Sequence, residues 1–188
     1  MFQPTVETLE ARTNPSSVTF SNHVITITGD AGVNDCTVTV TQDRRVLVDI
    51  DSIHKEWKLD NVTAINANLS GNGDFFVYQN GYSDETTDYP PVDDSNVTLT
   101  VNLGAGHDAV VILGSDGARF VLSGNGGDDI LDCGGSTGGC TLKGGTGDDL
   151  LVGSWGDDLI QGGDGDDQID GEDGNDTLDG GAGADIIL

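Results

Sequence analysis

The sequence has little positive charge and no long hydrophobic run. Of its 188 residues only 7 are Lys or Arg, against 33 Asp or Glu, and the formal net charge is −26. A chain this acidic is repelled by a phosphate backbone, which argues against nucleic acid as a partner. No apolar run approaches the roughly 20 residues that a membrane-spanning helix needs. The N-terminus also lacks the hydrophobic stretch of a conventional signal peptide.

The motifs of common catalytic sites are missing as well. His23, His54 and His107 are scattered, and none has a cysteine or a second histidine at zinc-ligand spacing. No G-x-S-x-G, H-E-x-x-H or P-loop motif is present. The glycine-rich segments are turn formers, because no helix follows them as it would follow a phosphate-binding loop. We therefore expect that the protein is not an enzyme.

What the chain does have is 29 glycines, and from Gly114 they are periodic. Eight units begin with glycine and have glycine again at the fourth position; they start at Gly114, Gly124, Gly135, Gly144, Gly153, Gly162, Gly171 and Gly180. The last five follow one another without a break as GGTGDDLLV, GSWGDDLIQ, GGDGDDQID, GEDGNDTLD and GGAGADIIL. A fixed short period of this kind predicts a solenoid.

The nine-residue period has a physical reason. Six glycine-rich residues can turn tightly, because glycine reaches positive φ without steric cost. The other three make a short strand, and alternation points only its middle residue inward. That eighth position is aliphatic in every unit, at Val121, Leu131, Leu142, Leu151, Ile160, Ile169, Leu178 and Ile187.

These units resemble the RTX (repeats-in-toxin, hemolysin-type) calcium-binding nonapeptide, G-G-x-G-x-D-x-U-x with U aliphatic. The resemblance implies a parallel β-roll in which each unit stacks on the unit two places along. Stacked strands lie about 4.8 Å apart and calcium–oxygen bonds are about 2.4 Å long, so an ion between two turns reaches oxygens of both.

The resemblance also implies a ligand set for calcium, made of the carboxylate at the sixth position and main-chain carbonyls of the turns. The carboxylates are those of Asp129, Asp149, Asp158, Asp167, Asp176 and Asp185. The carbonyls are those of Gly124, Gly126, Gly144, Thr146, Gly153, Trp155, Gly162, Asp164, Gly171, Asp173, Gly180 and Ala182. Five further aspartates, Asp116, Asp128, Asp148, Asp157 and Asp166, lie off the ligand position, and we expect them to contribute field or outer contacts.

Two units depart from the pattern, with Arg119 and Cys140 at the sixth position. Both fall on the same side of the expected roll, although the inserted Ser123 and the pair Cys133–Gly134 could reset the alternation. The other side carries three stacked pairs of aspartates, and this side carries one, which predicts about four well-formed calcium sites. Because crowded carboxylates repel one another and the aliphatic core is thin, we expect calcium to drive folding. The alternative is a disordered acidic tail.

Residues 18–113 alternate at period two in several β-branched runs, which predicts strands. INANLSGNGDFFVY from Ile65 resembles LTVNLGAGHDAVVI from Leu99, an internal duplication about 34 residues apart. We expect an all-β chain in which a degenerate solenoid leads into the β-roll of residues 114–188; a small β-sandwich is the alternative for residues 18–113. Asp35, Asp74 and Asp108 lie in degenerate turns, as relic ligands or as ordinary turn residues that form local hydrogen bonds.

Cys133 and Cys140 bracket the glycine-rich span GGSTGG in the unit that lost its aspartate. A disulfide could replace the missing calcium there in an oxidising compartment; otherwise Cys140 is just a small residue where no ligand is needed. Cys36 is expected to pack as a small hydrophobe.

The start of the chain, PTVETLEARTNPS from Pro4, resembles a short leader of exported and surface bacterial proteins. Residues 1–17 are either that leader or an unstructured tail. We therefore expect an extracellular or cell-surface structural or interaction module. The alternative is a folding and export accessory region of a larger secreted toxin or hydrolase. An end-to-end homo-oligomer and an unknown surface partner both stay open.

Overall fold

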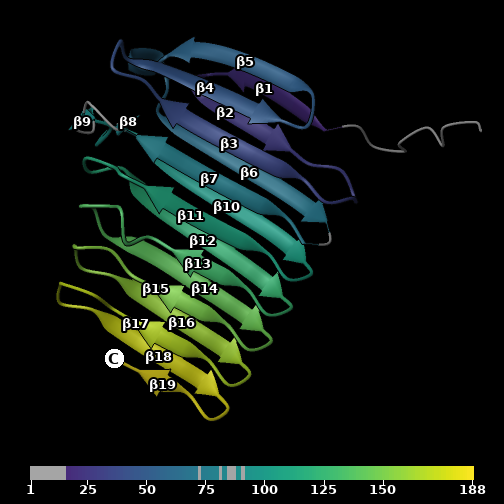
Figure 1. Cartoon of the computed structure of the whole chain (residues 1–188), viewed down its shortest axis with the longest axis vertical. Coiled ribbons are helices and arrows are strands. Elements are labelled where there is room, and N and C mark those ends of the chain that lie inside the picture. Colours follow the sequence, from purple (N-terminus) through teal and green to yellow (C-terminus); the bar gives the residue numbers. More distant parts are fainter. Residues whose placement is uncertain (1–15, 72, 81, 84–87, 90–91) are drawn as a thin grey trace, which may run out of the picture.

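The chain folds into two facing β-sheets that together form a solenoid (Figure 1). The computed structural model describes residues 16–188 except 72, 81, 84–87 and 90–91, so residues 1–15, which carry the leader-like motif, lie outside the described part. The first sheet consists, in spatial order, of β1 (Ser17–Ser21), β2 (Val24–Thr28), β6 (Ala64–Gly71), β10 (Thr98–Ala105), β12 (Arg119–Gly126), β14 (Cys140–Thr146), β16 (Leu159–Asp164) and β18 (Thr177–Ala182). The second consists of β19 (Ile186–Ile187), β17 (Gln168–Asp170), β15 (Leu150–Val152), β13 (Ile130–Asp132), β11 (Ala109–Leu113), β7 (Phe75–Asn80), β3 (Asp35–Val40), β4 (Arg45–Ile50) and β5 (Ile53–Lys58).

Each coil of the solenoid contributes one strand to each sheet. All pairings from β2 to β18 and from β3 to β19 are parallel, and both sheets continue across residue 113. The internal duplication corresponds to two stacked coils, because Leu99 pairs with Ile65 and Val110 pairs with Phe76. The prediction of an all-β parallel solenoid is therefore confirmed.

Antiparallel strands close the N-terminal end. β1 pairs antiparallel with β2, and β3, β4 and β5 form an antiparallel meander that extends the second sheet. Phe20 and Trp57 pack against each other across this end, with ring centroids 5.8 Å apart. A short 3₁₀ helix, η1 (Leu59–Asn61), connects β5 to β6, and the two-residue strands β8 (Tyr82–Ser83) and β9 (Asp88–Tyr89) form a separate antiparallel pair. β1 and β5 are therefore the outer strands of the two sheets at this end.

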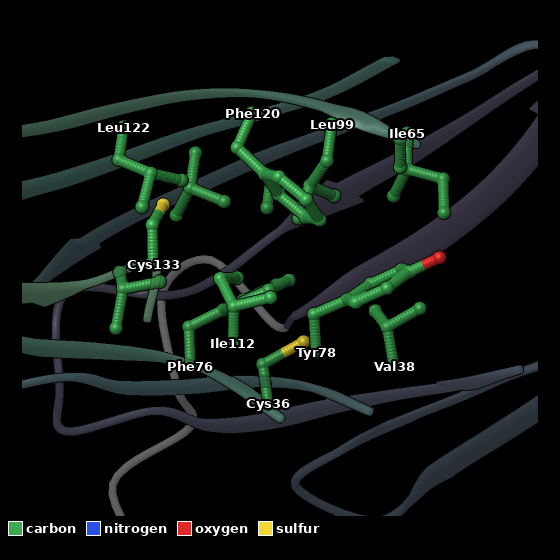
Figure 2. Packing of buried hydrophobic residues seen from close by; sticks show 14 of the residues in the cluster. Cys36, Val38, Ile65, Phe76, Tyr78, Leu99, Ile112, Phe120, Leu122 and Cys133 are labelled. Atoms are coloured by element: carbon green, nitrogen blue, oxygen red, sulfur yellow. The ribbon is translucent and has the colours of Figure 1, made fainter. Parts of the chain in front are cut away.

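The core lies between the sheets and becomes thinner along the chain. Figure 2 shows its wide part, where Ile65, Leu99 and Phe120 from the first sheet face Phe76 and residues beside it from the second. Towards the C-terminus each strand buries a single aliphatic residue: Leu131, Leu142, Leu151, Ile160 and Ile169 are fully buried. Leu178 is only partly buried, and Ile187 is 48% exposed.

The frame of the unit that begins at Gly114 differs from the prediction. Val121 is half-buried, whereas Leu122 is fully buried and pairs with Leu142. Phe120 pairs with Cys140, so Phe120, not Arg119, occupies the position of the sixth residue. Ser115 pairs with Ser136 and Ser123 pairs with Lys143, so the extra residue of this unit lies between Ser115 and Phe120, before the strand, and not at Ser123. Strand alternation therefore shifts the inward-facing residues of the unit by one position.

Candidate metal centres

The turns stack at two edges of the solenoid. The major turn edge contains the turns from β2 to β3, β6 to β7, β10 to β11, β12 to β13, β14 to β15, β16 to β17 and β18 to β19. The minor turn edge contains the turns from β11 to β12, β13 to β14, β15 to β16 and β17 to β18. Asp129, Asp149, Asp167 and Asp185 lie at the major edge, and Asp158 and Asp176 at the minor edge, so successive units alternate as expected.

A ladder of hydrogen bonds links the carboxylates of the major turn edge. Asp129 donates its backbone N–H to Oδ1 of Asp149 at 2.8 Å, Asp149 donates to Asp167 at 2.9 Å, and Asp167 donates to Asp185 at 3.0 Å. The ladder orients every carboxylate in the same way, because one oxygen of each is held by the neighbouring coil.

The other oxygen of these carboxylates has no hydrogen-bond donor. Among the described residues, Oδ2 of Asp108, Asp129, Asp149 and Asp167 is buried without a partner. A buried carboxylate oxygen in this state is costly unless a cation or proton compensates it.

Glycine at the first position of each unit leaves room beside that oxygen. A Cβ added at Gly144 would overlap Oδ2 of Asp149 and would lie 2.7 Å from the carbonyl oxygen of Gly162 in the next coil. Cβ atoms at Gly124 and Gly162 would meet the equivalent pairs of oxygens, with carbonyl distances of 2.8 and 2.5 Å. Each cradle thus brings a carboxylate oxygen and a main-chain oxygen together, which are the ligands that calcium prefers.

The environment disfavours the charged form of the Asp129, Asp149 and Asp167 carboxylates. Burial raises the pKa of Asp129 to about 7 and the pKa of Asp149 to about 6. Burial also raises the pKa of Asp167, and nearby carboxylates act in the same direction in all three. A divalent cation would reverse this effect, because it stabilises the ionised carboxylates.

Main-chain oxygens have to supply most of any coordination sphere. In the part of the chain that the structure describes, no three His, Cys, Asp or Glu side chains come together as a metal-binding group. The first-position carbonyls lie in the cradles. Third-position carbonyls, which the sequence also suggested, each accept a backbone N–H at the major edge: Gly127 donates to Thr146 at 2.8 Å, and Gly147 donates to Asp164 at 2.8 Å. Each of these third-position carbonyl oxygens therefore has only one lone pair left for a cation.

The minor turn edge has a different arrangement. Asp158 accepts the backbone N–H of Cys140 on Oδ1 at 2.5 Å and donates its own N–H to Asp176 at 2.9 Å. Ser154 donates its backbone N–H to Oδ2 of Asp158 at 2.6 Å and its hydroxyl to Oδ1 at 2.8 Å. Both oxygens of Asp158 therefore have protein donors, unlike those of Asp129, Asp149 and Asp167 at the major edge.

The fifth-position aspartates have a role that the sequence did not reveal. Oδ1 of Asp128 accepts the backbone N–H of Asp148 at 3.0 Å, and Oδ1 of Asp148 accepts that of Asp166 at 2.9 Å. Asp157 does the same for Asn175 at the minor edge, at 2.9 Å. This second, exposed ladder lies beside the buried one. Only the stacking of coils could show it, because each bond joins residues about two units apart.

The three cysteines are free, buried thiols. Cys133 and Cys140 interact through their side chains, and burial, followed by this contact, raises the pKa of Cys133 well above its usual range. A raised pKa slows disulfide formation, because the thiolate is the reactive form. The Cys133–Cys140 disulfide thus stays a prediction for oxidising conditions.

Comparison with known protein families supports the interpretation of these turns as calcium-binding repeats. Residues 134–161 and 152–187 match the RTX calcium-binding nonapeptide repeat (4 copies). Residues 134–187 are RTX repeats. RTX repeats bind calcium and form a structural, non-catalytic unit. No curated protein and no solved structure matches the chain. Within the described residues, no helix is long and apolar enough to cross a membrane.

Proposed function

We propose that this chain is a calcium-binding structural or interaction module that folds fully only when calcium lies between its stacked turns. The observation that carries the proposal is the row of buried, unpartnered Oδ2 atoms of Asp129, Asp149 and Asp167 at the major turn edge, each in a cradle with a main-chain oxygen of the next coil. A cation in each cradle would neutralise the charge and connect two coils at once.

The geometry supports three sites of this kind within the regular repeats. They use Oδ2 of Asp129, Asp149 and Asp167 with the carbonyls of Gly144, Gly162 and Gly180, and Asp185 closes the last coil. The fourth predicted site, between Asp158 and Asp176, also brings Oδ2 of Asp158 near a carbonyl, that of Gly171. We expect it to bind more weakly, because Ser154 already donates to both oxygens of Asp158.

Calcium should also decide whether the thin part of the solenoid folds. From Leu131 to Ile169 each strand buries one aliphatic residue, which contributes about 1.5–3 kcal/mol. The same units contain many glycines, whose ordering costs more entropy than that of any other residue. The wide N-terminal core and its antiparallel cap have no such deficit, so we expect them to keep their strands without calcium.

The experiment is a calcium titration of chelator-treated protein, followed by far-UV circular dichroism and tryptophan emission. Trp155 is 64% exposed in a turn of the minor edge, and Trp57 in the cap provides an internal reference. We expect a gain of β-structure with calcium that equal magnesium does not reproduce, because magnesium demands a tighter octahedral site. An unchanged spectrum together with no bound calcium would overturn the proposal.

We propose an extracellular or cell-surface location, where millimolar calcium can fill sites of modest affinity. A role as the accessory region of a larger secreted toxin or hydrolase would use the same calcium-driven folding.

β18 and β19 are the outer strands, and Ile186 is 57% exposed. Their unpaired edges support end-to-end self-association as a second proposal. Light scattering over a range of protein concentrations tests it; a constant monomer mass would exclude it.

A further inference from the structure

The outer face of the second sheet is apolar, although the solvent-facing residues of a sheet covered on one side are normally polar. β7 reads FFVYQN, β11 reads AVVIL and β15 reads LLV. Near-continuous apolar runs of this kind are typical of strands that are covered on both faces. The first sheet differs, because β10 begins TLTVNL and alternates inward apolar residues with outward polar ones. The second sheet therefore has the composition of a sheet with a further layer on its outer face.

The outward residues of four neighbouring strands form one continuous patch. β7, β11, β13 and β15 follow one another along the solenoid (Figure 1), and one row pairs in register across them, namely Phe75, Ala109, Ile130 and Leu150. Each of these residues precedes a fully buried residue of its strand, so strand alternation points it outward. Phe75 is 43% exposed, Ile130 is 44% exposed, and Leu113 at the end of β11 is 51% exposed. The outer apolar patch consists of Phe75, Ala109, Val111, Leu113, Ile130 and Leu150.

Acidic residues flank the outer apolar patch. Asp128 and Asp148 are exposed in the turns before β13 and β15, and Asp132 and Asp170 are half-buried on the outer face of β13 and β17. Within their described bounds, β7, β11, β13, β15 and β17 contain no Lys or Arg. The formal net charge of the whole chain is −26. The patch is therefore complementary to a partner surface that combines apolar and cationic side chains.

The size and charge of the patch favour one helix over a second copy of this chain. Four strands about 4.8 Å apart make the patch roughly 15 Å long, and three turns of an α-helix span about 16 Å. Two or three outward residues per strand make the patch roughly 10 Å wide, which is close to the diameter of a helix. A stable dimer buries about 800 Å² per partner, several times this area, and would bring the aspartates of two copies together.

We propose that the outer apolar patch binds a cationic amphipathic helix of a partner protein. The apolar stripe of the helix lies along the row from Phe75 to Leu150, across the strands, in the way that helices cover the faces of parallel sheets. Its Lys and Arg side chains lie beside Asp128 and Asp148 on one flank and beside Asp132 on the other. The inference rests on the proposed function as an interaction module and adds the class of partner. Calcium contributes to it only by keeping β13 and β15 folded.

The test uses a synthetic helical peptide of about 14 residues, with leucine along one face and lysine along the other, and the full chain in saturating calcium. Fluorescence anisotropy of the labelled peptide measures its binding to wild type, Ile130→Thr and Leu159→Thr. Leu159 is the matched control, because it is 42% exposed on the outer face of the first sheet, where it pairs with Thr141 and Thr177. We expect I130T to bind about fivefold more weakly, as for loss of one apolar contact at an interface, and L159T to bind as wild type does.

A second pair of variants tests the charged flank without changing an apolar residue. Asp148→Asn and Asp179→Asn each remove one negative charge, and Asp179 is exposed on the outer face of the first sheet. Asparagine at 148 retains the oxygen that accepts the backbone N–H of Asp166. We expect D148N to weaken peptide binding about two- to fivefold and D179N to leave it unchanged. This pair decides the question if far-UV circular dichroism shows that threonine at 130 disturbs the fold.

The outcomes separate the patch from attraction by charge alone and from the calcium proposal. Equal binding by I130T and L159T with equal binding by D148N and D179N, or equal affinity for a peptide of the same composition in scrambled order, would overturn the patch. A concentration-dependent dimer in light scattering that I130T abolishes would assign the patch to a second copy and would also overturn the inference. Wild type that takes up calcium but does not bind the peptide refutes this inference alone. Wild type that binds the peptide but takes up no calcium refutes calcium binding alone.

Discussion

Replacing Asp149 by asparagine separates its two oxygens by function. Oδ1 accepts the backbone N–H of Asp129 at 2.8 Å, and asparagine retains this acceptor. Oδ2 lies in the cradle beside the carbonyl of Gly162, without a donor. Asp149→Asn should therefore abolish one calcium site while the ladder stays intact.

The expected size of the effect follows from linkage. At a calcium concentration one hundred times the dissociation constant, one lost site lowers the free energy of unfolding by about 2.7 kcal/mol. Without calcium the sign should reverse or the effect should vanish, because a buried charge is removed and the new amide can donate to the Gly162 carbonyl, as Asn34 donates to that of Leu69.

The matched control is Asp148→Asn, in the same turn. Asp148 is exposed, and its Oδ1 accepts the backbone N–H of Asp166 at 2.9 Å, which asparagine also retains. We expect a change within about 0.5 kcal/mol with or without calcium. Urea unfolding of both variants, in saturating calcium and in calcium-free buffer, measures the difference. Equal calcium dependence of the two variants, or a D149N variant destabilised equally in both buffers, would refute the reasoning.

Three further predictions concern the cradles, the protons and the thiols. Gly162→Ala should weaken calcium binding by about one site, because its Cβ would overlap Oδ2 of Asp167; normal ion stoichiometry by native mass spectrometry would contradict the assignment of the cradle. In calcium-free buffer the folded fraction of the roll should be largest near pH 4 and should fall as the pH rises through about 7, because the folded pKa of Asp129 lies above its unfolded value near 3.9. The β-structure signal in far-UV circular dichroism measures this, and a signal that grows over that range would show the opposite sign. Calcium affinity should rise over the same range, as protons leave the ligands. Under denaturing, non-reducing conditions, loss of the thiols of Cys133 and Cys140 after mild oxidation would establish the disulfide, whereas three reactive thiols would exclude it.

The regular repeats were readable from the sequence because their determinants are local. The glycines of a unit fix its turn, one aliphatic residue fixes its inward face, and the fixed unit length fixes the alternation of edges. The repeat period alone therefore places Asp149 and Asp158 at opposite edges. Their role as ligands stays a prediction, since the structure establishes position and hydrogen bonding.

Where the period breaks, the residues within one unit do not determine the strand register. In the unit from Gly114 one extra residue moves Leu122 into the core in place of Val121, and Phe120 takes the position expected for Arg119. A single-residue shift reverses which face a strand side chain occupies. Only pairing with the neighbouring coils determines the register there.

The sequence by itself determined the solenoid, its period, the acidic turns and calcium as their expected ligand, because each depends on residues within one unit. Only the tertiary structure decided how the N-terminal end is closed and which carboxylate oxygens lack a donor. Oδ1 of Asp74 and of Asp108 accepts a backbone N–H from a coil 34 to 40 residues away, which only the stacked structure shows. Oδ2 of Asp74 has its donor, the backbone N–H of Gly71, within its own turn, so the folded path of each turn decides whether that oxygen needs a cation.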